Sequence, residues 1–479
     1  MGKVKSIFKS KAFLYILLVL FCFLLACLCK EYDCDLFARL IVGENFVKTG
    51  SVAYQDFLSY TQTHFWFDHE WGSGVVFYLF LKVLGPIGLI ILQAITMFFT
   101  IFFIIKTQKL QNPNYPISTA FIFCFHLVFS HLNPSIIRCH MFTFMFYAIT
   151  LYLLEKNRKT DSNLIWLFVP IAILWNNLHG GIASGLGMIF IYMVLEFIQR
   201  KKWIKYFKVL VVTLPFLLIN PYGIEYLNFL LFAYSTERDN ITEWLPVFAN
   251  RHILYYFPSF FICITSLIFV FQRILKNKKL DLTKLVATIT TVVLGTQYVK
   301  LLPIATITIA SLYYKEIMSL FSKNSIKILN KTAIIIMIIG IIYIPFSKPN
   351  TVKTNFNKFP IEEVEFIKTN NIKGNIFTDF ELGSYISYKL YPENLINFEH
   401  GKLGWDNVIT RYPTDIIIVQ KNTIGYIKMN SLPEWEKVYE GVFAGIFMRK
   451  NKTKKYVSPP QNIKYYQKTL FDNMGHFGK

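Results

Sequence analysis

Two acidic side chains, Asp33 and Asp35, follow directly on a run of about twenty mostly apolar residues near the N-terminus. A carboxylate at the centre of a bilayer costs about 2.5–3.5 kcal/mol even on lenient insertion scales, so acids beside such a run are candidates for chemistry. Asp33, nearer the run, could act as a general base. Asp35 could orient a substrate, or pair with Arg39 one helical turn later. The alternative to a chemical role is that both acids simply lie in a solvated loop.

Further ionisable residues stand between later apolar runs. Asp68, His69 and Glu70 end the same polar segment (residues 30–72), and Arg138, His179 and Lys300 lie in later segments. Cations and a hydrogen-bond donor of this kind could hold a phosphate at the membrane edge. Arg138 and Lys300 could instead extend toward lipid headgroups, and His179 could close a helix turn.

A metal site is a second possibility for the acidic residues. Asp33, Asp35, Asp68, His69 and Glu70 offer oxygen and nitrogen ligands that suit Mg²⁺ or Mn²⁺. Arginine, lysine and histidine can neutralise a phosphate without a metal, so a cofactor is not required. The seven cysteines show neither a disulfide framework nor a metal-type spacing.

The composition places the chain among polytopic membrane proteins. Hydrophobic residues make up 54% of its 479 residues and charged residues only 16%. Apolar runs predict about eleven transmembrane helices. Their ranges are 12–29, 86–105, 115–131, 140–154, 164–178, 181–198, 205–219, 255–271, 283–299, 301–318 and 332–346.

Lysine and arginine residues set the predicted orientation. They gather before the first span and in alternate loops, including 106–114, 199–208 and 272–284, while the other loops carry few bases. The positive-inside rule then places the N-terminus in the cytoplasm and the loop at 30–72 outside. The net charge of +21 is thus a topology signal and implies no nucleic-acid partner.

An odd number of spans also places the C-terminal part outside. We expect a transmembrane domain at 1–348, a small extracytoplasmic α/β domain at 350–450 and a basic tail at 451–479. Within the α/β domain, IEEVEFIKT has helical character, and GNIFTDF, NLINFE, DIIIVQ and GVFAGIFMR predict short strands. We predict no catalytic residue in this domain, whose role would be to bind an acceptor or cover the groove.

Several motifs occur in an order that resembles one enzyme superfamily. These are DCDLFARLIVG, GSVAYQDFLSYT, FWFDHEW, RCHMFTF, WNNLHGG, INPYG, ITEWLP and FTDFELGSYISYKLYPE. Together they resemble the multi-spanning GT-C glycosyltransferases, and among them the bacterial membrane proteins related to protein mannosyltransferases. Arg39 stands where relatives often have histidine, and Lys300 where an arginine is common. The resemblance extends over nearly all of residues 10–450.

The resemblance implies a function for the outer face. A hexosyltransferase of this type takes a sugar from a polyprenyl-phosphate carrier in the membrane and transfers it, with inversion, to a hydroxyl of a glycolipid, envelope glycan or protein. Asp33 and Asp35 would be the catalytic carboxylates. Donor phosphate or substrate would be bound by residues drawn from several loops, namely Arg39, His69, Glu70, Arg138, His179 and Lys300. A translocator or ligase-like handler of lipid-linked glycans, and a non-catalytic membrane scaffold, remain alternatives.

Overall fold

The computed structural model describes residues 11–27, 33–61, 66–113, 136–235, 241–249, 253–277, 280–319, 321–343, 358–399, 406–450 and 456–459. These form two compact units. The bundle unit comprises Met1–Cys29, Ile90–Ser135 and Cys139–Pro349, and the sheet unit comprises Lys30–Leu89, Ile136–Arg138 and Asn350–Lys479. The predicted span at 115–131 lies outside the described residues, as does most of the predicted tail.

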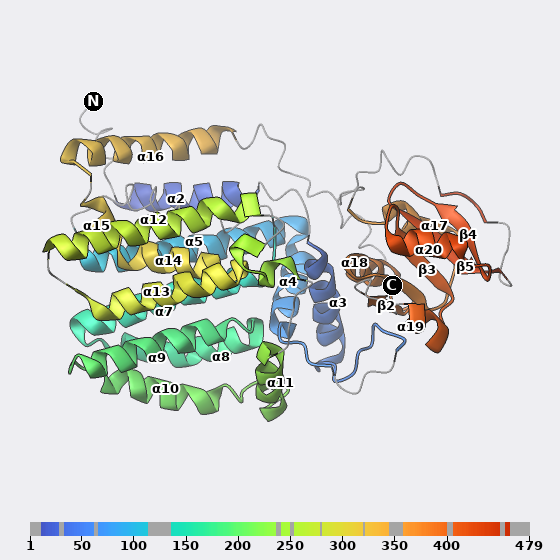
Figure 1. Cartoon of the computed structure of the whole chain (residues 1–479), viewed down its shortest axis with the longest axis horizontal. Helices are drawn as coiled ribbons and strands as arrows, with labels where there is room; N and C mark the ends of the chain where they lie inside the picture. Colours follow the sequence, from blue (N-terminus) through green and yellow to red (C-terminus); the bar gives the residue numbers. More distant parts are fainter. Residues whose placement is uncertain are drawn as a thin grey trace. The chain divides into compact units, whose positions relative to one another are not determined.

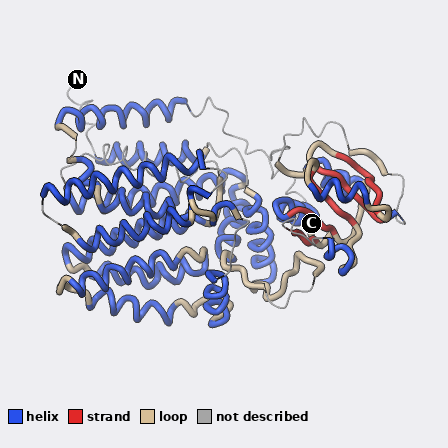
Figure 2. Tube along the Cα trace, viewed as in Figure 1, coloured by secondary structure: helices blue, strands red, loops and turns tan. Residues whose placement is uncertain are grey.

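The bundle unit is helical (Figures 1 and 2). Its helices are α2 (Lys11–Ala26), α5 (Pro86–Gln111, divided between the units after Leu89), α7 (His140–Thr160), α8 (Phe168–Leu178), α9 (Ile182–Ile198), α10 (Ile204–Phe216), α11 (Ile224–Ser235), α12 (Ile253–Asn277), α13 (Leu282–Gln297), α14 (Leu302–Leu312), α15 (Tyr314–Met318) and α16 (Lys323–Tyr343). Short 3-10 helices occupy Asn163–Leu167, Thr242–Trp244, Val247–Ala249 and Val299–Leu301.

Helix α14 forms the core of this unit, since every one of its residues is buried. Pro303 suits its first turn, where no intrahelical N–H is needed. The rest of α14 is rich in β-branched residues, which favour helices only weakly, so packing rather than propensity holds it helical. The Tyr147 hydroxyl of α7 and the Thr308 hydroxyl of α14 are hydrogen-bonded at 2.7 Å, and Gln108 Nε2 of α5 donates to the Ala310 carbonyl at 2.9 Å.

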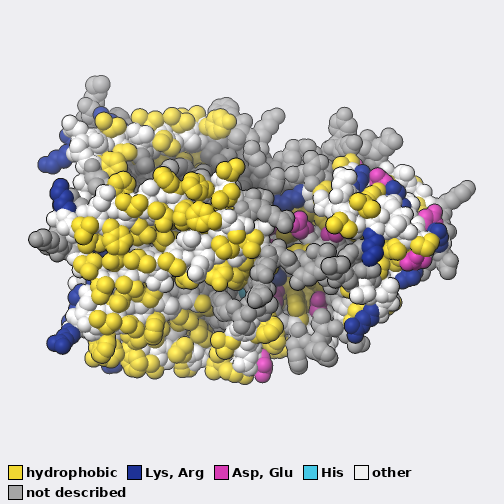
Figure 3. Space-filling model, in the orientation of Figure 1, with side chains coloured by type: hydrophobic (Ala, Val, Ile, Leu, Met, Phe, Trp, Pro, Cys, Tyr) yellow, Lys and Arg dark blue, Asp and Glu magenta, His cyan; other side chains and the backbone are white. Residues whose placement is uncertain are grey.

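The outer surface of the bundle unit is apolar. Figure 3 shows hydrophobic side chains over its visible face, with Lys and Arg side chains gathered at one end of the helices. Three described segments are long and apolar enough to cross a membrane: Pro86–Gln111, Ser259–Lys276 and Lys323–Tyr343. The remaining predicted spans within the described residues coincide with helices, several of them shorter. These helices are those expected of an integral membrane protein, and the number of eleven spans stays a prediction.

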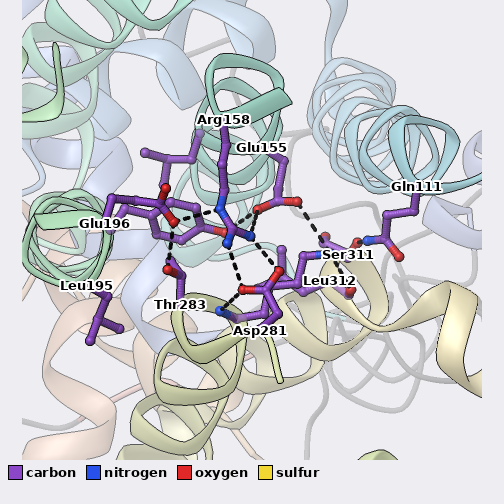
Figure 4. A network of polar contacts seen from close by, with 12 residues as sticks. Gln111, Glu155, Arg158, Leu195, Glu196, Asp281, Thr283, Ser311 and Leu312 are labelled. Atoms are coloured by element: carbon purple, nitrogen blue, oxygen red, sulfur yellow. Dashed lines mark hydrogen bonds and ion pairs between the residues drawn. The ribbon is translucent and has the colours of Figure 1, made fainter. Parts of the chain in front are cut away.

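A network of buried ion pairs joins α7, α9 and α13 near the end of α7 (Figure 4). The Arg158 guanidinium contacts Glu196 Oε1 at 2.7 Å and both carboxylate oxygens of Asp281 at 2.7 and 2.8 Å. Its Nη1 also lies 3.6 Å from Glu155, to which the Tyr192 hydroxyl donates at 2.9 Å. The Arg158 side chain is only 13% exposed, so this one cation pairs with carboxylates from three elements, and Lys284 adds a second positive charge at 3.5 Å from Glu155.

The sheet unit contains α3 (Cys34–Thr49), α4 (Trp71–Leu84), α17 (Ile361–Thr369), α18 (Phe380–Leu390), α19 (Asp406–Arg411) and α20 (Ile424–Ser431). Its five strands are β1 (Ile376–Asp379), β2 (Ile396–Glu399), β3 (Ile416–Gln420), β4 (Trp435–Glu440) and β5 (Ala444–Arg449). Their order is β2-β1-β3-β5-β4. Strand β1 pairs in parallel with β2 and β3, and β5 pairs antiparallel with β3 and β4.

The predicted helix IEEVEFIKT is α17, and the four predicted strands are β1, β2, β3 and β5. The sequence analysis missed β4, in which only Trp435 is buried, and the helices α18, α19 and α20, the first of which follows β1 without a loop. It also assigned the loop at 30–72 and the C-terminal part to different domains. In the structure these segments share one unit: the Leu58 carbonyl accepts from Ile396 N at 2.8 Å, and the hydroxyls of Tyr60 and Thr414 are bonded at 2.9 Å.

Replacing Arg158 tests the ion-pair network. We expect Arg158→Ala to lower the free energy of unfolding by about 3–5 kcal/mol, because three acidic groups lose a buried counterion. Thermal unfolding of the purified protein in detergent measures this. Lys202→Ala is the matched control: Lys202 pairs with Asp161 at 2.9 Å but is 82% exposed, so its loss should change stability by less than about 1 kcal/mol. Equal losses in the two variants would contradict a structural role for the network.

Candidate active site

The predicted catalytic acids meet one arginine in the sheet unit. Asp33 precedes the first turn of α3 in an extended conformation, and its Oδ2 lies 2.5 Å from Arg138 Nε. The same guanidinium bonds to Asp35 through Nη2. Arg138 lies in the short segment before α7, 103 residues after Asp35. The structure thus brings together three residues predicted from two separate motifs.

The two acids differ in their surroundings. The Asp33 side chain is 13% exposed and the Asp35 side chain 52% exposed. Burial raises the pKa of Asp33 above its ordinary value, while the Arg138 charge lowers it and Asp35 raises it further. A shielded carboxyl with a raised pKa is the better proton acceptor, because base strength rises with pKa. The Cys34 thiol donates to Asp33 Oδ1 at 3.3 Å.

Arg39, also in α3, belongs to a second group of ion-paired side chains. Its guanidinium bonds to Asp68, and its Nε lies 3.7 Å from Glu70. Asp68 is buried and also accepts from the Glu70 backbone N–H at 2.8 Å. His69 is partly exposed beside Glu70, at 3.7 Å. The pairing suggested between Asp35 and Arg39 was therefore wrong: each side chain pairs with a charge from a distant segment.

The position of α3 depends on a close contact between helices. A Cβ atom on Gly43 would lie 2.0 Å from the carbonyl oxygen of Gly74, and one on Gly74 would lie 2.5 Å from the Arg39 carbonyl oxygen. The backbones of α3 and α4 therefore touch, which only glycine permits here. This contact places the start of α4, and with it the Asp68–Glu70 turn, beside Arg39.

The bundle unit holds His179 in a defined orientation. The Gly181 backbone N–H donates to His179 Nδ1 at 2.9 Å. Thr143 Oγ1 lies 2.7 Å from the same nitrogen and accepts from Trp175 Nε1 at 2.9 Å. Because Nδ1 accepts, the neutral ring carries its proton on Nε2, which becomes the hydrogen-bond donor. The His140 ring lies beside it, with centroids 4.7 Å apart.

Lys300 lies in the bundle unit against an aromatic side chain. Its ammonium lies 2.9 Å from the centroid of the Trp244 ring, and the Tyr298 ring meets the same indole edge-on. The Val299 N–H donates to the Leu245 carbonyl at 3.3 Å, joining the two segments. The motifs ITEWLP and TQYVKLLP are thereby adjacent. A cation–π contact of this kind is worth about 0.5–2 kcal/mol and fixes the position of the charge.

The predicted metal ligands do not converge. Asp33 and Asp35 face Arg138, while Asp68 and Glu70 face Arg39. Within the described residues, no three His, Cys, Asp or Glu side chains are placed to hold a metal ion. The five predicted ligands therefore lie in two separate ion-paired groups.

Sequence analysis missed three contributors to these groups. Thr143 orients His179, Lys358 acts electrostatically on Asp33, and Ser384 Oγ donates to the Cys34 carbonyl at 2.8 Å. Ser384 lies in the motif FTDFELGSYISYKLYPE. This motif contributed to the family resemblance but implied no role for Ser384. The sequence carries no signal for Lys358.

Comparison with known proteins gives the fold. No protein-family model matches the sequence, and no curated protein matches it. Among solved structures, the chain is similar to ArnT from Cupriavidus metallidurans bound to undecaprenyl phosphate, with a TM-score of 0.56 and 10% identity over 91% of this chain and 97% of that chain. The apo state of the same protein matches with a TM-score of 0.56 and 9% identity. The chain therefore shares the fold of these solved structures over most of its length, as the motif resemblance predicted.

We predict that Gly43→Ala separates α3 from α4. The added methyl would overlap the Gly74 carbonyl, so we expect a loss of about 1–3 kcal/mol in the free energy of unfolding, measured by thermal unfolding in detergent. Gly187→Ala in α9 is the matched control, since its Cβ would meet nothing within 4 Å. It should be neutral or slightly stabilising. Unchanged stability of Gly43→Ala would contradict the backbone contact.

The orientation of the His179 ring predicts which substitution preserves a hydrogen-bond donor at the position of Nε2. Glutamine can place an amide N–H near the position of Nε2, whereas asparagine mimics Nδ1. For an anionic ligand that accepts from His179 Nε2–H, we therefore expect His179→Gln to retain most of the affinity and His179→Asn to lose about tenfold, the effect of one charge-assisted hydrogen bond. Binding of undecaprenyl phosphate to each purified variant in detergent measures this. The reverse order would show that Nδ1 faces the ligand.

Proposed function

We propose that this protein is a membrane glycosyltransferase that moves a sugar from a polyprenyl-phosphate carrier to an acceptor hydroxyl. One observation carries the proposal: a shielded carboxylate, Asp33, is held against Arg138 beside the more exposed Asp35. The fold supports it, since the similar ArnT structure has undecaprenyl phosphate bound. Undecaprenyl phosphate or a related lipid would be the carrier here.

Asp33 is the proposed base. The acceptor hydroxyl gives its proton to the Asp33 carboxylate as its oxygen bonds to the anomeric carbon of the sugar. The bond from that carbon to the phosphate oxygen breaks, and its electron pair leaves with the polyprenyl phosphate. Attack opposite the leaving group inverts the anomeric centre. A positioned base contributes about 10²–10⁴ in rate.

The leaving phosphate gains negative charge, so cations must stabilise it. Arg138 is the proposed partner near Asp33, and its planar guanidinium suits bidentate binding of an oxyanion. His179, with Nε2–H as donor, and Lys300, fixed over Trp244, are candidates for binding the donor phosphate from the motif resemblance. Arg39, His69 and Glu70 would bind the sugar or the acceptor. The proposed acceptor is a hydroxyl of a glycolipid, an envelope glycan or a protein.

We place this site on the outer face of a bacterial inner membrane. The support is the distribution of lysine and arginine over alternate loops, together with their gathering at one end of the bundle in Figure 3. The N-terminus would then be cytoplasmic and the C-terminal part extracytoplasmic.

Exchanging each acid for its amide tests the mechanism. Asp33→Asn keeps the size of the side chain and removes its basicity, so we expect turnover to fall by about 10²–10⁴ with donor binding nearly unchanged. Asp35→Asn should lower turnover less and weaken the apparent affinity for acceptor. The measurement is sugar transfer in vesicles made from cells expressing each variant, with the native lipid extract as donor and acceptor source.

The outcomes separate the alternatives. Turnover that survives Asp33→Asn but collapses with Asp35→Asn would reverse the two roles. Survival of both changes would remove the glycosyltransferase mechanism, and continued movement of lipid-linked glycan would then favour a translocator. Glu436→Gln, on the exposed face of β4, serves as a charge-matched control and should leave transfer unchanged.

A further inference from the structure

A short segment before α17 lies against the first turns of α3. Phe359 is buried, and its ring meets the Phe37 ring edge-on with centroids 5.3 Å apart. Tyr385 of α18 contacts both rings, at 5.2 Å each. Phe37 stands four residues after Asp33, one turn along α3. The three aromatic rings therefore fix residue 359, and with it Lys358, close to the start of the helix.

A second contact fixes the same turn. Ser384 Oγ of α18 donates to the carbonyl of Cys34, the residue between the two acids. The C-terminal part of the chain thus holds the Asp33–Asp35 turn through both a hydrogen bond and ring packing. Lys358 is exposed and acts on Asp33, since its charge lowers the pKa of that carboxyl, although less than Arg138 does.

The charges at this turn show why a second cation matters. Asp33 and Asp35 carry two negative charges and Arg138 one positive charge, so the three groups together have a net charge of −1. A lipid phosphate is itself an anion and would be repelled by such a group. Adding Lys358 brings the net charge to zero. Arg39, on the same helix, is already paired with Asp68 and Glu70.

We infer that Lys358 is a second anion-binding residue of this site, supplied by the C-terminal part and contacting the phosphate of the lipid-linked donor. The inference rests on the proposed function, because it assigns the donor phosphate to the Asp33–Arg138 turn. It replaces our expectation that the C-terminal part only binds acceptor or covers the groove.

Direct binding tests this without turnover. Undecaprenyl phosphate in detergent micelles is titrated into the purified full-length protein, with tryptophan fluorescence as the readout. We expect Lys358→Ala and Lys358→Gln to raise the Kd about tenfold at low salt, with a smaller difference at high salt, because the contact is a screened surface charge. Lys358→Arg should retain affinity. Lys373→Ala is the control, since that lysine is exposed and pairs with Glu393 in the same unit.

A pH profile of sugar transfer distinguishes an electrostatic role of Lys358 from a purely structural one. A purely structural role would leave the pH dependence unchanged. The groups acting most strongly on Asp33 are Arg138, Asp35, Cys34 and Lys358. Removing the Lys358 charge raises the pKa of Asp33, so the base protonates at higher pH. The acid limb of the profile should therefore move to higher pH in Lys358→Ala and stay in place in Lys373→Ala.

The binding results distinguish failure of the Lys358 inference from failure of the proposed function. If the wild type binds undecaprenyl phosphate and both neutral Lys358 variants bind it equally well, the inference is overturned and the proposed function stands. Wild-type protein that fails to bind this lipid at all would overturn the inference together with the proposed donor. Weaker binding in Lys373→Ala to the same extent would assign the effect to net charge and also overturn it.

Discussion

Arg138 holds two carboxylates at the start of α3, and the rest of the sheet unit is arranged to keep them there. Asp33 is mostly removed from water, and a buried carboxylate needs a counterion or it becomes protonated. A guanidinium can serve two carboxylates at once because its N–H donors spread in a plane. The pairing requires α3 to begin at a fixed point, which the glycine contact with α4 and the rings around Phe37 provide.

Three parts of the chain build this environment. The loop after the first apolar run supplies the acids, the segment before α7 supplies Arg138, and the C-terminal part supplies Ser384 and Lys358. The loop is joined to the sheet by a backbone hydrogen bond between Leu58 and Ile396. The C-terminal part is accordingly a component of the candidate site.

In the bundle unit, helix α7 has a polar group of side chains near each of its ends. His140 opens this helix beside His179, and Arg158 near its other end neutralises Glu196 and Asp281. With 21 residues the helix is about 30 Å long, close to the thickness of a bilayer's hydrocarbon core. The apolar stretch between the two groups explains why polar side chains concentrate at the ends, where water and headgroups can solvate what the protein does not pair.

The sequence by itself determined the membrane class, most helices, four of five strands and the residue types of the site, because these follow from local hydrophobic periodicity and from motif order. Only the tertiary structure decided which charges pair. Asp35 meets Arg138, 103 residues away, while the nearer Arg39 turns to Asp68. Lys358 acts electrostatically on Asp33, and the neighbouring Phe359 packs on Phe37. Such contacts depend on how distant segments fold together, and no local pattern in the chain encodes them.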